Sequence, residues 1–91
     1  MKNRTLPYGY CCENGEIVLQ LQESKILAWI YKEYAGGESL ANIAKQLNSE
    51  EIEYMVGVIA WNKGRLKRLL EDERYLGTEK YPSIIDKEIY M

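Results

Sequence analysis

Apolar residues recur at helical spacing in three parts of the chain. In the first part, Ile26, Leu27, Ile30, Tyr31 and Tyr34 fall at i, i+1, i+4, i+5 and i+8. This spacing predicts a helix at about residues 23–35. They fall at i, i+3, i+4 and i+7 in a second helix, about residues 39–48, and share one face of a third, about residues 62–73. The pattern therefore predicts three amphipathic helices around one core. Their core-facing residues are Ile26, Leu27, Ile30, Tyr31, Tyr34, Leu40, Ile43, Ala44, Leu47, Leu66, Leu69 and Leu70.

Capping residues mark the ends of the same helices. Gly36 and Gly37 follow the first helix, and glycine readily adopts the left-handed backbone that ends many helices. Ser39 and Asn62 stand at the starts of the second and third helices, where a short polar side chain can accept a hydrogen bond from a backbone N–H. We therefore expect Ser39 and Asn62 to be N-caps.

A β-hairpin is predicted before the helices, at about residues 8–20. Asn14 and Gly15 separate two short strand-like runs, and both turn residues tolerate a positive φ. Two strands alone are marginally stable in water, so this hairpin must pack on the helices. The expected fold class is mainly α with a small N-terminal β-hairpin (α+β), in one domain over residues 1–91 with a three-helix core.

Two stretches lack a clear helical period. Residues 49–60 are partly apolar and fit either a short strand or a buried loop; we interpret them as a loop. Tyr75 and Leu76 should anchor the stretch that follows the third helix to the core. Residues 86–91 have the pattern of a fourth helix, but one this short is not stable alone.

The second and third helices have the pattern of a helix-turn-helix unit. Ala44 is small enough to let a second helix cross closely. Residues 49–61 separate the two helices, against three or four residues in the usual turn. The pattern therefore fits a helix-turn-helix-like arrangement with a long inter-helix loop.

The composition is that of a small globular protein. The chain has 91 residues, 46% of them hydrophobic and 29% charged, which suffices for one modest core and excludes large enzyme architectures. No apolar run reaches the roughly 18–20 residues that cross a bilayer, and no secretory signal is recognisable. We therefore expect a cytoplasmic protein that neither crosses nor binds a membrane.

Residues suited to catalysis or metal binding are scarce. Histidine is absent, which removes the commonest general base and metal ligand. The chain has no phosphate-binding glycine loop and no nucleophile motif, and its serines fit caps or turns. Cys11 and Cys12 are adjacent, which favours reduced structural thiols, with redox or intermolecular chemistry as the alternative. The sequence predicts no enzyme activity, no cofactor, no metal and no small-molecule substrate.

Charges are unevenly distributed along the third predicted helix. Its first half holds the bases and its second half Glu71, Asp72 and Glu73, the reverse of the order that the helix dipole favours. A solvated polar face would explain such a run, but the order also favours a helix that meets phosphates. The net charge is only −2, so DNA binding would depend on this local patch. The candidate DNA-binding residues are Asn62, Lys63, Gly64, Arg65, Lys67 and Arg68.

A further observation concerns several short segments and their order along the chain. They read PYGY at 7–10, NGEIV at 14–18, IYKEYAGG at 30–37, SLANIAKQLN at 39–48, WN, RLL and RYLG within 61–77, and YPSII at 81–85. In this order they resemble the recombinase domain of the large serine recombinases. The pattern departs at residues 51–53, Glu-Ile-Glu in place of Gly-Ile-Pro, and at residues 56–57, Val-Gly in place of Pro-Gly.

The resemblance implies the DNA-binding domain of a serine-type site-specific recombinase. Such a domain binds double-stranded DNA, recognises part of an attachment site and positions a catalytic domain, which is absent from this chain. It implies that the third helix is the DNA-reading element. Two alternatives stay open: a stand-alone protein-interaction module, which binds a recombinase catalytic domain or itself, and a small DNA-binding regulator of a mobile element.

Overall fold

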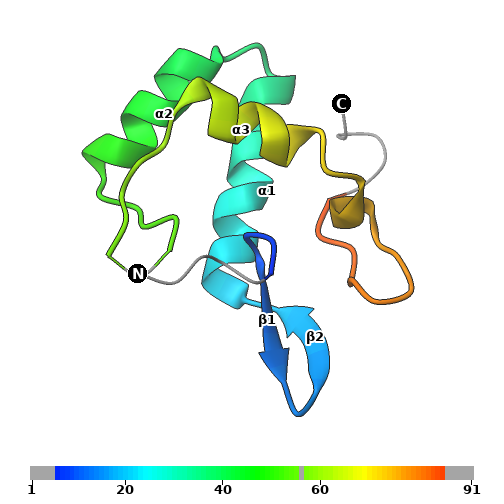
Figure 1. The fold of residues 1–91 in the computed structure, drawn as a ribbon. Coiled ribbons are helices and arrows are strands. Elements are labelled where there is room, and N and C mark those ends of the chain that lie inside the picture. Colours follow the sequence, from blue (N-terminus) through cyan, green and yellow to red (C-terminus); the bar gives the residue numbers. More distant parts are fainter. Residues whose placement is uncertain (1–5, 56, 86–91) are drawn as a thin grey trace.

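A two-stranded hairpin precedes three helices in the computed structural model, which describes residues 6–55 and 57–85 (Figure 1). The architecture is mainly helical α+β with the hairpin at the N-terminal side, as the sequence predicts. In chain order the elements are β1 (Tyr10–Glu13), β2 (Glu16–Leu19), α1 (Leu21–Ala35), α2 (Leu40–Ser49), α3 (Lys63–Leu70) and a short 3₁₀ helix, η1 (Glu73–Leu76).

The hairpin turns at Asn14 and Gly15. Their φ angles are 53° and 80°, the pair of positive values that a two-residue hairpin turn of the favoured hand requires. The hairpin is tied to the other end of the fold by Tyr10, whose hydroxyl donates to the backbone carbonyls of Arg74 at 3.0 Å and Pro82 at 2.7 Å. These bonds explain how two short strands are held in place.

The helix α1 begins two residues before the predicted start. The side chain of Gln20 accepts a hydrogen bond from the backbone N–H of Glu23 at 2.8 Å, so Gln20 is the N-cap. Leu21, the first helical residue, is therefore outside the core and 70% exposed. At the other end Gly37 has the positive φ, 102°, that the glycine pair predicts.

The three helices meet in one core, and α3 crosses α1 in Figure 1. Most of the predicted core-facing residues are buried, while Ile26, Tyr34 and Leu40 lie at its edge. Tyrosines from outside the three α-helices complete this core. The buried hydrophobic residues are Tyr8, Tyr10, Leu27, Ile30, Tyr31, Ile43, Ala44, Leu47, Trp61, Leu66, Leu69, Leu70, Tyr75 and Ile85.

The connection between α2 and α3 is a loop, as predicted for most of residues 49–60, although Ser49 still belongs to α2. Asn48 closes this loop: its side-chain amide donates to the carbonyl of Trp61, and its side-chain oxygen accepts from the N–H of Trp61, both at 2.9 Å. The indole N–H of Trp61 in turn donates to the carbonyl of Ile52 at 2.8 Å. One polar side chain and one indole thus fix the distance between the two helices.

The helix α3 is shorter than predicted. It ends at Leu70, whereas the sequence pattern extends it to about residue 73. Asp72 instead has an extended backbone, and its carboxylate accepts from the N–H of Arg74 at 3.0 Å, so that it caps η1. This break turns the chain and lets Tyr75 enter the core, where it is 0% exposed.

The shorter α3 corrects the argument drawn from its charge order. The three acidic residues lie beyond the helix, and Lys67 and Arg68 lie in its last turn, where the helix dipole favours cations. Lys63 and Arg65, both in the first turn, oppose the dipole. The case for a functional basic surface therefore rests on where the cations lie in space.

Two further expectations concern the ends and the surroundings of the chain. The predicted start of a fourth helix at residues 86–91 lies outside the described residues. Within residues 6–55 and 57–85, no helix has the length and apolar character required to cross a membrane.

Candidate nucleic-acid interface

One side of α3 carries cations and the other side packs on the core. Leu66, Leu69 and Leu70 are buried, which fixes the rotation of the helix. The exposed residues of the helix are Lys63 at its start and, on the side away from the leucines, Gly64, Lys67 and Arg68; we call these four residues the basic face. These four are among the six residues that the sequence selects as candidate DNA-binding residues.

Asn62, the fifth candidate, is the N-cap of α3, as predicted. Its side-chain oxygen accepts a hydrogen bond from the backbone N–H of Arg65 at 2.8 Å. This bond holds the first turn of the helix in place. Asn62 therefore supports the basic face by fixing where the helix begins.

Arg65, the sixth candidate, points to the inter-helix loop. Its guanidinium carbon lies 3.9 Å from the centre of the Tyr54 ring, in cation–π geometry. One guanidinium nitrogen also donates to the backbone carbonyl of Ala60 at 2.6 Å. The side chain is half-buried, so Arg65 fastens the loop to α3 as well as contributing positive charge.

Arg74 is a cation near this surface that the sequence reasoning missed. Its guanidinium nitrogens bind the Asp72 carboxylate in two places, Nη2 to Oδ2 at 2.6 Å and Nε to Oδ1 at 2.9 Å. Burial by itself would raise the pKa of Asp72, but the hydrogen bonds and charge of Arg74 outweigh it and lower that pKa. Asp72 thus stays ionised and pairs with Arg74 in η1.

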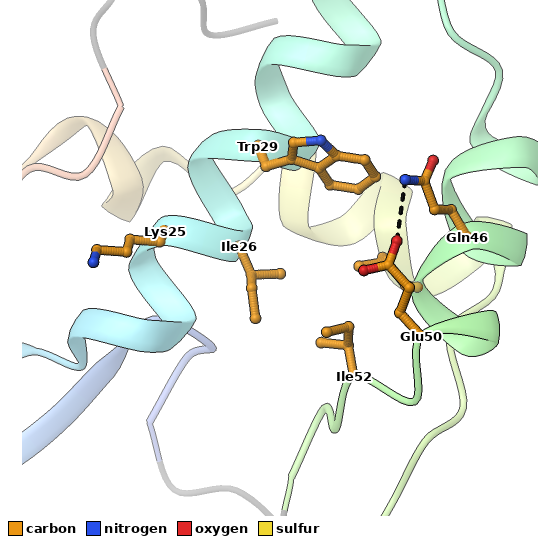
Figure 2. A pocket seen from close by; sticks show the side chains of 7 residues that line it. Lys25, Ile26, Trp29, Gln46, Glu50 and Ile52 are labelled. Carbon is orange, nitrogen blue, oxygen red and sulfur yellow. Dashed lines mark hydrogen bonds between the residues drawn. The ribbon is translucent and has the colours of Figure 1, made fainter.

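A second surface feature is a groove between α1 and α2 (Figure 2). Its volume is about 260 Å³, and Trp29 covers one side of it. The amide of Gln46 donates to the Glu50 carboxylate at 3.2 Å across its α2 side. No residue of α3 lines this groove, so it is separate from the basic face. Its lining residues are Lys25, Ile26, Trp29, Gln46, Leu47, Glu50 and Ile52.

The other reactive side chains do not gather into a site. Within residues 6–55 and 57–85, no three side chains of the His, Cys, Asp and Glu types are placed to hold a metal ion. Cys11 is half-buried and Cys12 exposed, and both are free thiols. The basic face is therefore the clearest candidate for recognising another molecule.

Comparison with known proteins gives one family match. A family model described as Recombinase matches residues 21–90, a region that contains α1, α2 and α3 and begins just after the hairpin. Neither the curated proteins nor the solved structures contain a match.

Proposed function

This chain belongs to the Recombinase family, and from that membership we propose that it is a double-stranded DNA-binding domain of a serine-type site-specific recombinase. In this proposal the domain recognises part of an attachment site. The strand-cleaving serine belongs to a catalytic domain outside this chain. The domain's task is to place that catalytic domain on the DNA.

The basic face of α3 is the observation that carries the proposal. The helix has eight residues and is therefore about 12 Å long, at about 1.5 Å per residue. With its side chains an α-helix is about 10–12 Å across, so one helix fits the major groove, which is about 12 Å wide. The fold presents the helix with its leucines inward and Lys63, Lys67 and Arg68 outward, so its exposed side is the one that would meet DNA.

Each residue of the basic face has a physical role in such a complex. Lys63 and Lys67 are ammonium groups on flexible stems, which suit phosphates on either wall of the groove. Arg68 has the planar fork that binds phosphate or guanine in two places. Gly64 has no side chain, which would let the helix backbone come close to the DNA.

We assign strand cleavage to the separate catalytic domain for chemical reasons. A serine nucleophile needs an activating base or a cluster of cations beside it. The chain has no histidine, and no serine stands on α3 with the basic face. Ser39 is an N-cap, and its side chain accepts from the N–H of Asn42 at 3.1 Å.

The test is a titration of mixed-sequence duplex DNA with the wild type and a Lys67→Ala/Arg68→Ala double variant, from about 50 to 200 mM salt. We expect weak, salt-sensitive binding by the wild type. The double variant should bind more weakly, with a salt slope smaller by about two, roughly one for each phosphate that the variant no longer neutralises. Lys45→Ala is the control, because Lys45 is an exposed lysine of α2 outside the basic face. Equal binding by the double variant and the wild type would contradict the proposal.

The absence of cleavage is tested separately. The purified chain, incubated with supercoiled DNA that carries the attachment site, should neither nick it nor remain covalently attached after denaturation. A covalent adduct would place the chemistry in this chain.

The groove between α1 and α2 favours a second candidate, a module that associates with itself through Trp29. Sedimentation of the wild type and Trp29→Ala over a range of protein concentrations distinguishes the two. If the wild type dimerises through Trp29 and does not bind duplex DNA at low salt, the second candidate replaces the first.

A further inference from the structure

A cavity of about 210 Å³ lies beside the basic face, where α3, η1, the inter-helix loop and the segment before β1 come together. Its volume is several times the roughly 30 Å³ that a water molecule occupies in the liquid, so it can hold a larger group. Four distant parts of the chain contribute to its wall. The lining residues are Pro7, Tyr8, Tyr54, Arg65, Arg68, Leu69, Asp72, Arg74 and Tyr75.

Positive charge predominates in this cavity. Three arginines line it, against the single carboxylate of Asp72, which is bound by Arg74 at 2.6 Å. Arg65 is held by the carbonyl of Ala60 and the Tyr54 ring. Arg68 has no hydrogen bond or ion pair with any other residue in the described part of the chain. The cavity therefore has two positive charges in excess and one arginine fork available to bind a ligand.

Tyr75 contributes a buried hydroxyl to the same wall. Its side chain is 0% exposed, and the hydroxyl makes no hydrogen bond within residues 6–55 and 57–85. Two other buried tyrosines are bonded: the hydroxyl of Tyr31 donates to the carbonyl of Leu69 at 2.7 Å, and that of Tyr10 donates to two carbonyls. A buried hydroxyl without a partner is costly, so it marks a place where an acceptor from outside the protein is favoured.

The surroundings of this hydroxyl keep it a donor. Burial raises the pKa of Tyr75 well above its ordinary value, and the Asp72 carboxylate raises it further. Both Tyr75 and Asp72 line the cavity. The hydroxyl therefore stays protonated at neutral pH and can donate a hydrogen bond to an anion.

We propose that this cavity binds a phosphate group, namely a backbone phosphate of the DNA that lies along α3, with Arg68 as its ion-pair partner and Tyr75 as a hydrogen-bond donor. This inference rests on the proposed DNA-binding function and adds the position of one anchoring contact. A phosphodiester has only acceptors, and apart from Asp72 the charged groups of the cavity are donors. Because α3, η1 and the loop all form the cavity, a phosphate bound there would fix the register of α3 in the groove.

The decisive variant is Tyr75→Phe, which removes the hydroxyl and leaves the ring in the core. We expect unchanged or higher thermal stability, because the hydroxyl makes no hydrogen bond with the described residues. Its affinity for mixed-sequence duplex DNA should fall about tenfold, the size of one hydrogen bond to a charged group. Tyr34→Phe is the matched control, since Tyr34 is a partly buried tyrosine of α1 that does not line this cavity. If Tyr75→Phe binds duplex DNA as the wild type does, the proposal is wrong.

A second measurement identifies the source of the phosphate and separates this inference from the proposed function. The melting temperature is measured in inorganic phosphate and in chloride of equal ionic strength, for the wild type, Tyr75→Phe and Arg68→Ala. A stabilisation by phosphate that is absent in both variants, without any effect of Tyr75→Phe on DNA binding, would show a site for free phosphate and overturn the DNA assignment. If Lys67→Ala weakens DNA binding while Tyr75→Phe does not and phosphate has no effect, the proposed function stands and the cavity proposal fails.

Discussion

The helices α2 and α3 have the same inner construction. Each begins after a capping side chain that accepts from the third helical N–H, Ser39 at 3.1 Å and Asn62 at 2.8 Å. Each then buries an apolar residue at its fourth position, Ile43 in α2 and Leu66 in α3. The two helices therefore start and pack on the core in the same way.

Their outer faces differ. At the first position α2 has the half-buried Leu40 and α3 the exposed Lys63. At the second position α2 has Ala41, a strong helix former, and α3 has Gly64, a poor one. The fold needs neither the extra cations nor the glycine of α3, because α2 packs on the same core without them. Under the proposed function the outer face of α3 is the surface that meets DNA, and the following variants test that comparison.

The largest effects should come from what the two helices share. Leu47→Ala in α2 and Leu69→Ala in α3 should each lower the free energy of unfolding by roughly 2–5 kcal/mol, because each leaves a cavity in the core. Chemical denaturation measures this, with Leu21→Ala as the exposed control, expected within about 0.5 kcal/mol of the wild type. A cost below about 1 kcal/mol for Leu69→Ala, on the order of an ordinary surface change, would mean that α3 is not fixed by its leucines.

The caps should contribute about equally. Ser39→Ala and Asn62→Ala should each cost about 1 kcal/mol, since each leaves one backbone N–H of the first turn without its acceptor. Asn62→Ser keeps an acceptor at the same place and should recover most of this stability, as thermal unfolding would reveal. If Asn62→Ala costs nothing while its DNA affinity falls, Asn62 contacts DNA and is not chiefly a cap.

Substitutions at the second helical position should change the stability in opposite directions in the two helices. Gly64→Ala should stabilise the protein by about 0.5 kcal/mol, and Ala41→Gly should destabilise it by a similar amount, because glycine loses more backbone freedom on folding. The added Cβ at Gly64 would lie 3.4 Å from the side-chain oxygen of Asn62, a contact that leaves room for it. Gly64→Ala should nevertheless bind duplex DNA more weakly than the wild type. Unchanged DNA binding would remove the functional explanation for the glycine.

The smallest effect on stability should come from the cations. Arg68→Ala should change the free energy of unfolding by no more than about 0.5 kcal/mol, as should Lys45→Ala on α2, because both side chains are exposed. Only Arg68→Ala should lower DNA affinity. Unfolding of the Arg68→Ala variant would show that this side chain is structural, and the comparison between the two helices would fail.

Local signals account for what could be predicted from the sequence. The Asn14-Gly15 turn, the two N-caps and the apolar stripe of each helix depend on residues within a few positions of one another, so the sequence alone determined them. The stripe also determined that Lys67 and Arg68 face away from the core, because helical geometry sets the angle between them and the leucines.

Only the tertiary structure decided the rest, because it brings together residues that are distant in sequence. The helix pattern continued to about residue 73, but the burial of Tyr75 requires the chain to turn at Asp72, and α3 ends at Leu70. Arg65 is among the candidate DNA-binding residues of the sequence, but the loop returns over it and places Tyr54 against its guanidinium. The arginine-lined cavity likewise forms only where four parts of the chain meet, since no local pattern can encode a contact between segments that the fold alone makes neighbours.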